Sequence, residues 1–126
     1  MRPADRVWQK LITRSTLLAI LIAVAGCHSH HIEATIENHT GAAITLLEVD
    51  YPSASFGADI LAPDGIFHHR IQTRGNGPIS VQYTATGSRT VQINGPTLQE
   101  GQEGSIEIVL LPAGKAEFHP SLTPQP

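Results

Sequence analysis

The residues best suited to chemistry stand in one short run, Cys27-His28-Ser29-His30-His31. Imidazole nitrogens are good ligands for Zn, Cu and Ni ions. In an extended chain His28 and His30 lie on one side with His31 next to them, so the three histidines form a candidate metal site. No carboxylate or second Cys in the run completes a fixed site, and the alternative is a polar tether that leads into a folded domain.

A second pair of histidines, His68 and His69, is followed directly by Arg70. Neighbouring residues of a strand point to opposite faces, so the two rings are poorly placed to hold one metal ion. If Phe67 and Ile71 face the core, His69 lies on the core side as a buried or rim histidine. His68 and Arg70 then form a small cationic patch outside, which is either a solvated face or a contact for an anion or partner.

Phe56 lies among small residues in the segment 51–57, of which we expect residues 53–57 to be a loop. Loops carry a large share of ligand and partner contacts. Phe56 is therefore a candidate partner contact, and the alternative is that its ring plugs one end of the folded domain.

Catalytic motifs are weak in this chain. There is no Gly-x-Ser-x-Gly elbow, and Gly75-Asn76-Gly77 lacks the third glycine and the helix of a dinucleotide site. A hydrolytic triad could be drawn from the residues Asp50, Asp59 and Asp64 with His68 or His69, although no spacing requires it. We expect no enzyme activity, no catalytic residue and no cofactor, and keep a small hydrolase as the least favoured hypothesis.

The elements that must position these residues are short runs in which apolar and polar residues alternate. The runs lie at 32–37, 44–51, 59–61, 66–73, 79–85, 90–94 and 105–111. Turn residues separate them, including Asn38-His39-Thr40-Gly41, which also contains an N-glycosylation pattern. Seven strands at spacings near ten residues predict an all-β, antiparallel sandwich over 32–111. The proline-rich segment 112–126 is expected to be an extended or disordered tail.

The strand pattern of the body is similar to that of immunoglobulin-like and transthyretin-like envelope domains. The cysteine and tryptophan pattern of antibody domains is absent, because Trp8 lies far upstream of the strands. Strand pattern alone implies a fold and no activity.

The first 26 residues have the layout of a helical signal peptide. Four basic residues and one acidic residue precede or flank an uncharged run from Thr16 to Gly26. A bilayer-spanning helix needs about 20 apolar residues, so this shorter run is typical of a signal-peptide core.

Val24-Ala25-Gly26-Cys27 resembles the lipobox of bacterial lipoproteins. The resemblance implies cleavage between Gly26 and Cys27 and acylation of the Cys27 thiol, with 27–31 as a lipidated tether. In that family an Asp after the cysteine often retains the protein in the inner membrane. His28 stands there in this chain, which favours the outer membrane, facing the periplasm.

Charge separates the leader from the body. Residues 27–126 contain four basic and ten acidic side chains, which repel phosphate backbones and give no reason to expect a nucleic-acid partner. The sequence therefore predicts a lipid-anchored, non-enzymatic structural or binding module that meets other envelope proteins or polymers. The alternative is a metal-binding envelope lipoprotein that uses His28, His30 and His31.

Overall fold

The computed structural model describes residues 29–123, most of which lie in β-strands. The strands are β1 (Ile32–Asn38), β2 (Ile44–Tyr51), β3 (Ala54–Leu61), β4 (Ile66–Ile71), β5 (Gly77–Ala85), β6 (Arg89–Leu98), β7 (Gly104–Leu111) and β8 (Lys115–Leu122). One turn of 3-10 helix, η1 (Pro112–Gly114), joins β7 to β8. The expected signal peptide (1–26), Cys27 and His28 lie outside the described residues.

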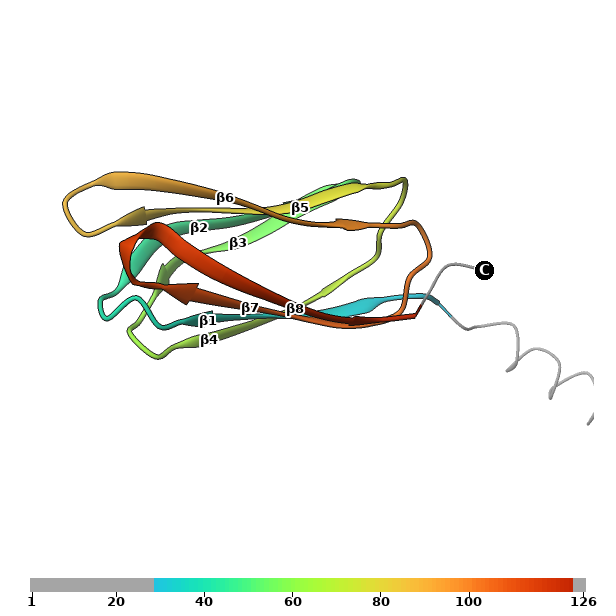
Figure 1. Ribbon diagram of the computed structural model, residues 1–126, viewed down its shortest axis with the longest axis horizontal. Helices are drawn as coiled ribbons and strands as arrows, with labels where there is room; N and C mark the ends of the chain where they lie inside the picture. The colour runs from blue at the N-terminus through green and yellow to red at the C-terminus, as the bar shows by residue number, and fades with distance from the viewer. Residues whose placement is uncertain (1–28, 124–126) are drawn as a thin grey trace, which may run out of the picture.

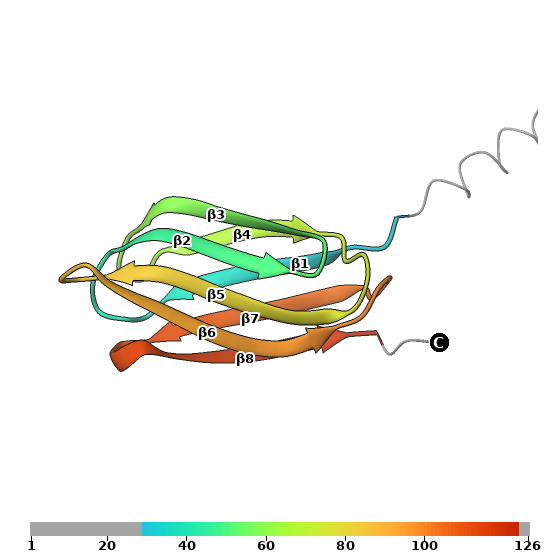
Figure 2. The same ribbon diagram turned by 90° about the horizontal axis from the view of Figure 1, so that it is seen from above.

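The strands form two four-stranded sheets that pack face to face (Figure 1, Figure 2). One sheet has the order β4-β1-β7-β8 and the other has the order β3-β2-β5-β6. All neighbours are antiparallel except β1 and β7, which run parallel. The predicted all-β class is therefore confirmed. The sheets are mostly antiparallel, and the parallel β1–β7 pair departs from the antiparallel sandwich that the sequence predicts.

One apolar core fills the space between the sheets. In β1 the buried residues Ile32, Ala34 and Ile36 alternate with polar residues on the outer face, as the pattern predicts. The strands β2 to β7 supply the rest of the core. Ala116 and Phe118 of β8 are partly exposed and pack against it. Since each sheet buries only one face, the polar alternation of the sequence is explained by a two-layer domain.

Residues 53–57, expected to be a loop, belong largely to β3. The hairpin turns at Pro52 and Ser53, and Phe56 pairs with Val49 across it. Gly57 permits this pairing, because a β-carbon at that position would overlap the backbone carbonyl oxygen of Leu47. Gly57, one of the small residues that suggested a loop, is thus what lets β3 approach β2 closely.

The expected tail is also different in the structure, because residues 115–122 form an eighth strand. β8 pairs with β7 along its whole length, and Pro120 lies opposite Ile106. β8 is an edge strand, where a proline can leave its nitrogen on the unpaired side without breaking the ladder. The proline content of 112–126 therefore does not prevent pairing, and the sandwich has eight strands rather than seven.

The strand order is not immunoglobulin-like. In immunoglobulin constant domains the first two strands are neighbours in one sheet. Here β1 and β2 lie in different sheets, joined by a corner at residues 39–43, and β1 pairs with β4 and β7 instead.

Aromatic rings close both open sides of the sandwich. Phe56 of β3 is buried and stacks on His69 of β4, with ring centroids 4.3 Å apart and an interplanar angle of 17°. Phe67 lies next along this stack, 6.1 Å from Phe56. On the other side, Phe118 of β8 fills the space that a side chain at Gly95 of β6 would occupy. The two sheets are thereby held together along their edge strands.

The corner between β1 and β2 is built around Asn38, which is fully buried. Its Nδ2 donates to the carbonyl oxygens of Ala42, Leu61 and Ala62 at 2.8, 3.0 and 3.0 Å. Its Oδ1 accepts from the amide and hydroxyl of Thr40 at 3.1 and 2.7 Å. The amide group therefore ties the β1–β2 corner to the end of β3 in the opposite sheet.

Backbone bonds extend this junction. The Asn38 amide donates to Gly65 O at 3.0 Å, and the Asp64 amide donates back to Asn38 O at 2.8 Å. The His39 amide donates to Leu110 O of β7 at 2.8 Å. Because the Asn38 side chain is engaged on all sides, the folded domain leaves no free amide for glycosylation at Asn38.

We predict that Asn38→Ala lowers the free energy of unfolding by about 3 kcal/mol, because several buried polar groups lose their partners together. Urea denaturation followed by circular dichroism measures this change. The matched control is Asn76→Ala, which removes one exposed hydrogen bond to the Glu100 amide and is expected to cost about 0.5 kcal/mol. Equal losses in the two variants would contradict the role given to Asn38.

Candidate functional site

The two ends of the sandwich differ in what they carry. β1 begins and β8 ends at one end, because Ile32 pairs with Gly104 and Gly104 pairs with Leu122. We call this end the entry pole (right in Figure 1). The opposite end, the far pole, is made of the connections 39–43, 62–65, 86–88 and η1. At about 3.3 Å per residue, β1 separates the two poles by roughly 20 Å.

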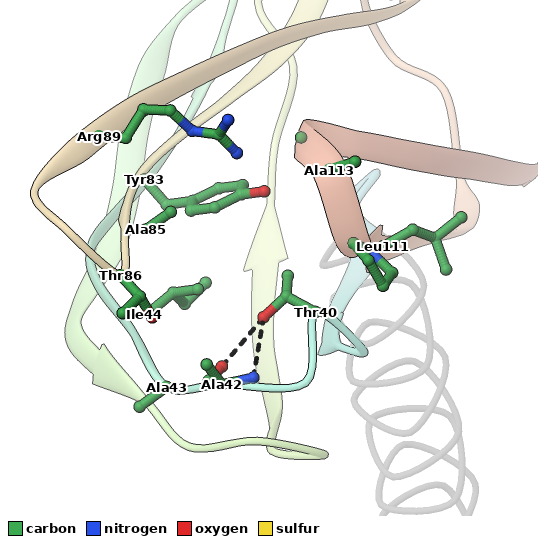
Figure 3. A pocket seen from close by; sticks show the side chains of 12 residues that line it. Thr40, Ala42, Ala43, Ile44, Tyr83, Ala85, Thr86, Arg89, Leu111 and Ala113 are labelled. Atoms are coloured by element: carbon green, nitrogen blue, oxygen red, sulfur yellow. Dashed lines mark hydrogen bonds between the residues drawn. The ribbon is translucent and has the colours of Figure 1, made fainter.

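The far pole contains a pocket of about 160 Å³ between the β1–β2 corner, the β5–β6 hairpin and η1 (Figure 3). Residues from four strands and three connections meet there because all of these segments end at this pole. The lining includes Thr40, Ile44, Tyr83, Arg89, Leu111 and Gly114.

Tyr83 supplies the aromatic wall of the pocket. It faces inward from β5, where it alternates with Gln82 and Thr84, and its ring is almost fully buried. The hydroxyl end points toward η1 in Figure 3. Burial raises the pKa of the Tyr83 hydroxyl, and the nearby positive charge of Arg89 offsets part of that rise. Tyr83 is therefore a neutral hydrogen-bond donor at neutral pH.

Arg89 is the only ionisable cation that lines the pocket. It starts β6 directly after the Gly87-Ser88 turn, and its guanidinium extends above the Tyr83 ring (Figure 3). A β-carbon placed on Gly114 would lie 3.9 Å from Arg89 Nη2, so η1 passes close to the guanidinium. Within residues 29–123, Arg70 pairs with Glu33 at 3.0 Å, whereas Arg89 has no carboxylate partner.

Thr40 forms the floor of the pocket, but its polar atoms serve the corner. Its hydroxyl lies 2.7 Å from Asn38 Oδ1. It also lies 3.0 Å from Ala42 O and accepts from the Ala42 amide at 3.4 Å (Figure 3). The pocket therefore rests directly on the Asn38 junction.

Uncommon backbone conformations gather at the far pole. The non-glycine residues of 29–123 with positive φ are Leu46, Asp64, Ser88 and Ala113, with φ between 51° and 64°. All four lie in or beside the connections of the far pole, whereas the entry pole has only glycines in this region of φ. Such conformations cost of order 1–3 kcal/mol each and are often retained where a surface is used.

Exposed apolar side chains follow the same distribution. Leu46, Ile60 and Ile66 are 66%, 64% and 54% exposed, and each lies within three residues of a far-pole connection. Leu46 occupies an irregularity in the β2–β5 pairing, which turns its side chain outward. The far pole thus combines the pocket, strained backbone and unburied apolar surface.

The candidate metal ligands are held by different acidic partners. His30 Nδ1 lies 2.7 Å from Glu103 Oε1, and His31 Nε2 lies 3.6 Å from Glu33 Oε1. Within residues 29–123, no three His, Cys, Asp or Glu side chains are grouped closely enough to hold a metal ion. His28 lies outside these residues, so the metal hypothesis stays a prediction.

The residues expected to contact a partner lie on opposite faces of β4. His68 and Arg70 point outward from β4, as predicted, but Arg70 pairs with Glu33 and His68 Nδ1 lies 3.2 Å from Thr35 Oγ1. The two residues therefore belong to a mixed polar sheet face instead of a cationic patch. Phe56 is buried against His69, which places it as a plug of the sandwich edge and His69 as a rim histidine.

The histidines and aspartates considered for a triad do not come together as one. His69 stacks on Phe56, and His68 approaches Thr35. The aspartate next to a histidine is Asp64, whose Oδ1 lies 3.6 Å from His39 Nδ1 on an exposed surface.

Sequence reasoning missed Tyr83 and Arg89. Both looked ordinary, one as an inward position of an alternating strand and the other as a residue after a turn. The register of the β5–β6 hairpin places both on the inward face, since Tyr83 pairs with Val91 and Ala85 pairs with Arg89. The pocket also needs the wall of η1, and residues 112–114 were expected to start a tail. Comparisons with protein-family models, curated proteins and solved structures find no match for this chain.

A second, wider hollow of about 640 Å³ lies beside β2 and β3 and reaches Phe67 of β4. Glu48 and Asp59 contribute acidic groups to it, and Leu46 and Phe67 contribute apolar ones. Glu48 shares its strand face with Asp50. Protonated Glu48 donates a hydrogen bond to the Asp50 carboxylate, and this bond, the like charge of Asp50 and desolvation raise the pKa of Glu48 above 4.5.

We predict that Asp50→Asn lowers the pKa of Glu48 toward 4.5, because the variant loses the like charge. A carboxyl whose pKa is raised by folding stabilises the protein below its unfolded pKa and loses that contribution as pH rises through its folded pKa. Wild-type protein should therefore lose more stability than Asp50→Asn as pH rises through this window. Carbon-13 NMR titration of Glu48 and thermal melts from about pH 3 to pH 7 measure both effects. Identical Glu48 titrations in the two proteins would refute the coupling.

Proposed function

We propose that this chain is a lipid-anchored protein of the bacterial cell envelope that acts as a non-enzymatic binding module. The leader carries the first part of the proposal. A basic segment, a short uncharged core and Val24-Ala25-Gly26-Cys27 occur in the order that lipid attachment requires. Two or three acyl chains, at about 0.8 kcal/mol per buried CH₂, are enough for a stable anchor.

The observation that carries the binding role is the difference between the two poles of the domain. Cys27 precedes Ile32 by five positions, so an acylated Cys27 would lie within about 17 Å of the entry pole. The far pole, with its pocket and exposed apolar residues, would then face away from the membrane. A module anchored in this way presents its most distinctive surface to soluble or polymeric partners.

Charge supports the same orientation. The body holds ten acidic and four basic side chains, and an anionic lipid surface repels such a domain. The anchor and the repulsion together favour a domain that stands off the membrane on its tether. His28 after Cys27 favours the outer membrane, with the domain facing the periplasm.

For the fold, we propose the transthyretin-like pattern as the better of the two resemblances. The separation of β1 and β2 into different sheets is incompatible with the immunoglobulin order. Two four-stranded sheets with short connections leave both poles available for contacts. The fold itself implies no activity.

We predict that the full chain, expressed in a bacterial host, is recovered in the membrane fraction with acyl mass on Cys27 as the first residue. Cys27→Ser should lack this mass and keep its leader, because the nucleophile that receives the lipid is gone. Mass spectrometry of the N-terminal peptide measures both outcomes. The matched control is Ser29→Ala, which lies outside the lipobox and should be acylated normally.

A wild-type protein that begins at Met1 would overturn the anchoring proposal, and so would one that begins at an unmodified Cys27.

A further inference from the structure

We infer that the far-pole pocket binds a carboxylate carried on a small apolar or aromatic group, with Arg89 and Tyr83 as the groups that hold the carboxylate. The inference names a ligand class for the binding role proposed above and so rests on that role. It concerns the pocket alone, and the pocket can be tested whether or not Cys27 is acylated.

The charge of the pocket comes from one side chain. Arg89 is the single ionisable cation among the lining residues, and no Asp or Glu lines the pocket. Most acidic side chains of the described body lie on the sheet faces and in other loops. A guanidinium without a carboxylate partner, beside a low-dielectric wall, attracts an anion more strongly than the paired Arg70 does.

The hydrogen-bond donors of the pocket match the charge and the two oxygens of a carboxylate. The guanidinium offers a planar fork of N–H donors, and the Tyr83 hydroxyl offers one neutral donor on the same side of the pocket (Figure 3). This set suits the two oxygens and single charge of a carboxylate. A phosphate dianion would face one cation on a domain with an excess of acidic groups, so a carboxylate is favoured over a phosphate.

The pocket also has an apolar wall. Ile44, Leu111 and several alanines line the wall below the donors. A volume of about 160 Å³ admits a short aliphatic chain or one small ring and excludes a large ligand. The free acid of a small molecule and the carboxyl end of a peptide share this chemistry, and both fit the description.

The floor of the pocket and η1 are held in fixed positions. Ala113 adopts φ 64°, which turns η1 over the β5–β6 hairpin, and Thr40 in the floor is fixed by the Asn38 junction. The Tyr83 ring is packed in the core and loses little freedom when a ligand binds, whereas the exposed Arg89 side chain is ordered by the ligand. The floor, the aromatic wall and η1 are therefore in place before any ligand arrives.

The test uses the full chain, labelled with nitrogen-15 and held in neutral detergent micelles, with benzoate as the probe and benzamide as its uncharged analogue. We expect saturable shifts in the backbone resonances of Tyr83, Arg89 and Gly114 on adding benzoate. Benzamide should bind at least about tenfold more weakly, since it has no charge for Arg89 to meet.

The variants separate the roles of the two donors. Arg89→Gln is expected to weaken benzoate binding by about tenfold or more, and Tyr83→Phe by about threefold to tenfold. The control is Arg74→Gln at the entry pole, which should leave the affinity unchanged. A free and an amidated trialanine peptide form the second arm. Tighter binding of the free peptide than of benzoate identifies a chain end as the ligand, and the reverse order identifies a small free acid.

The inference is overturned if benzoate shifts no resonance of the pocket at about 50 mM, a concentration well above the millimolar affinities of weak ligands. Equal benzoate affinity in wild-type protein and Arg89→Gln would overturn it as well. Because the readout is the pocket itself, either result leaves the acylation of Cys27 to its own mass measurement.

Discussion

The buried side-chain amide of Asn38 holds the far pole together. Asn38 Nδ2 has two hydrogens and three carbonyl oxygens within 3.0 Å, so at least one hydrogen is shared. Burying polar groups without partners costs free energy, whereas burying them in a complete network specifies one arrangement. Asn38 satisfies the ends of β1 and β3 and the start of β2 at once.

The path of the whole chain depends on this junction. After β1 the chain must leave its sheet and enter the other, which exposes backbone groups at the corner 39–43. The Asn38 side chain supplies the partners that a sheet ladder can no longer provide. With the corner fixed, β2 begins in the second sheet, and β1 is left free to pair with both β4 and β7.

The pocket is a consequence of the same corner. Thr40 forms its floor and bonds to Asn38 Oδ1, while Tyr83 and Arg89 approach from the β5–β6 hairpin. η1 completes the wall because Ala113 adopts a left-handed conformation there. The corner that stabilises the fold therefore also supplies part of the proposed binding pocket. The strained backbone lies at this same pole.

Local pattern was sufficient to predict much of the fold. Alternation in β1, β5 and β7 identified the inward residues, since side-chain direction in a strand follows from position alone. Pattern failed where tertiary contacts decide the outcome. Pro120 suggested disorder but is tolerated in an edge strand, and the small residues of 53–57 suggested a loop, whereas Gly57 among them allows close strand pairing.

The site could not be predicted for a related reason. Asn38 was recognised only as a turn residue, because its partners at Leu61 and Ala62 are more than twenty positions away. Arg89 and Tyr83 carry no local signal of a shared pocket. The β5–β6 hairpin brings them to one face, but the pocket also needs the wall of η1, which the proline content of the segment concealed.

Native-state hydrogen exchange at the corner tests the central claim most directly. The Thr40 amide donates to Asn38 Oδ1, and the Asp64 amide donates to Asn38 O. If the Asn38 junction organises the fold, both amides exchange only when the domain unfolds globally, with opening free energies equal to the global value. The Glu100 amide, bonded to Asn76 Oδ1 on an exposed loop, should exchange much faster. Exchange of Thr40 and Asp64 at the rate of Glu100 would contradict the account.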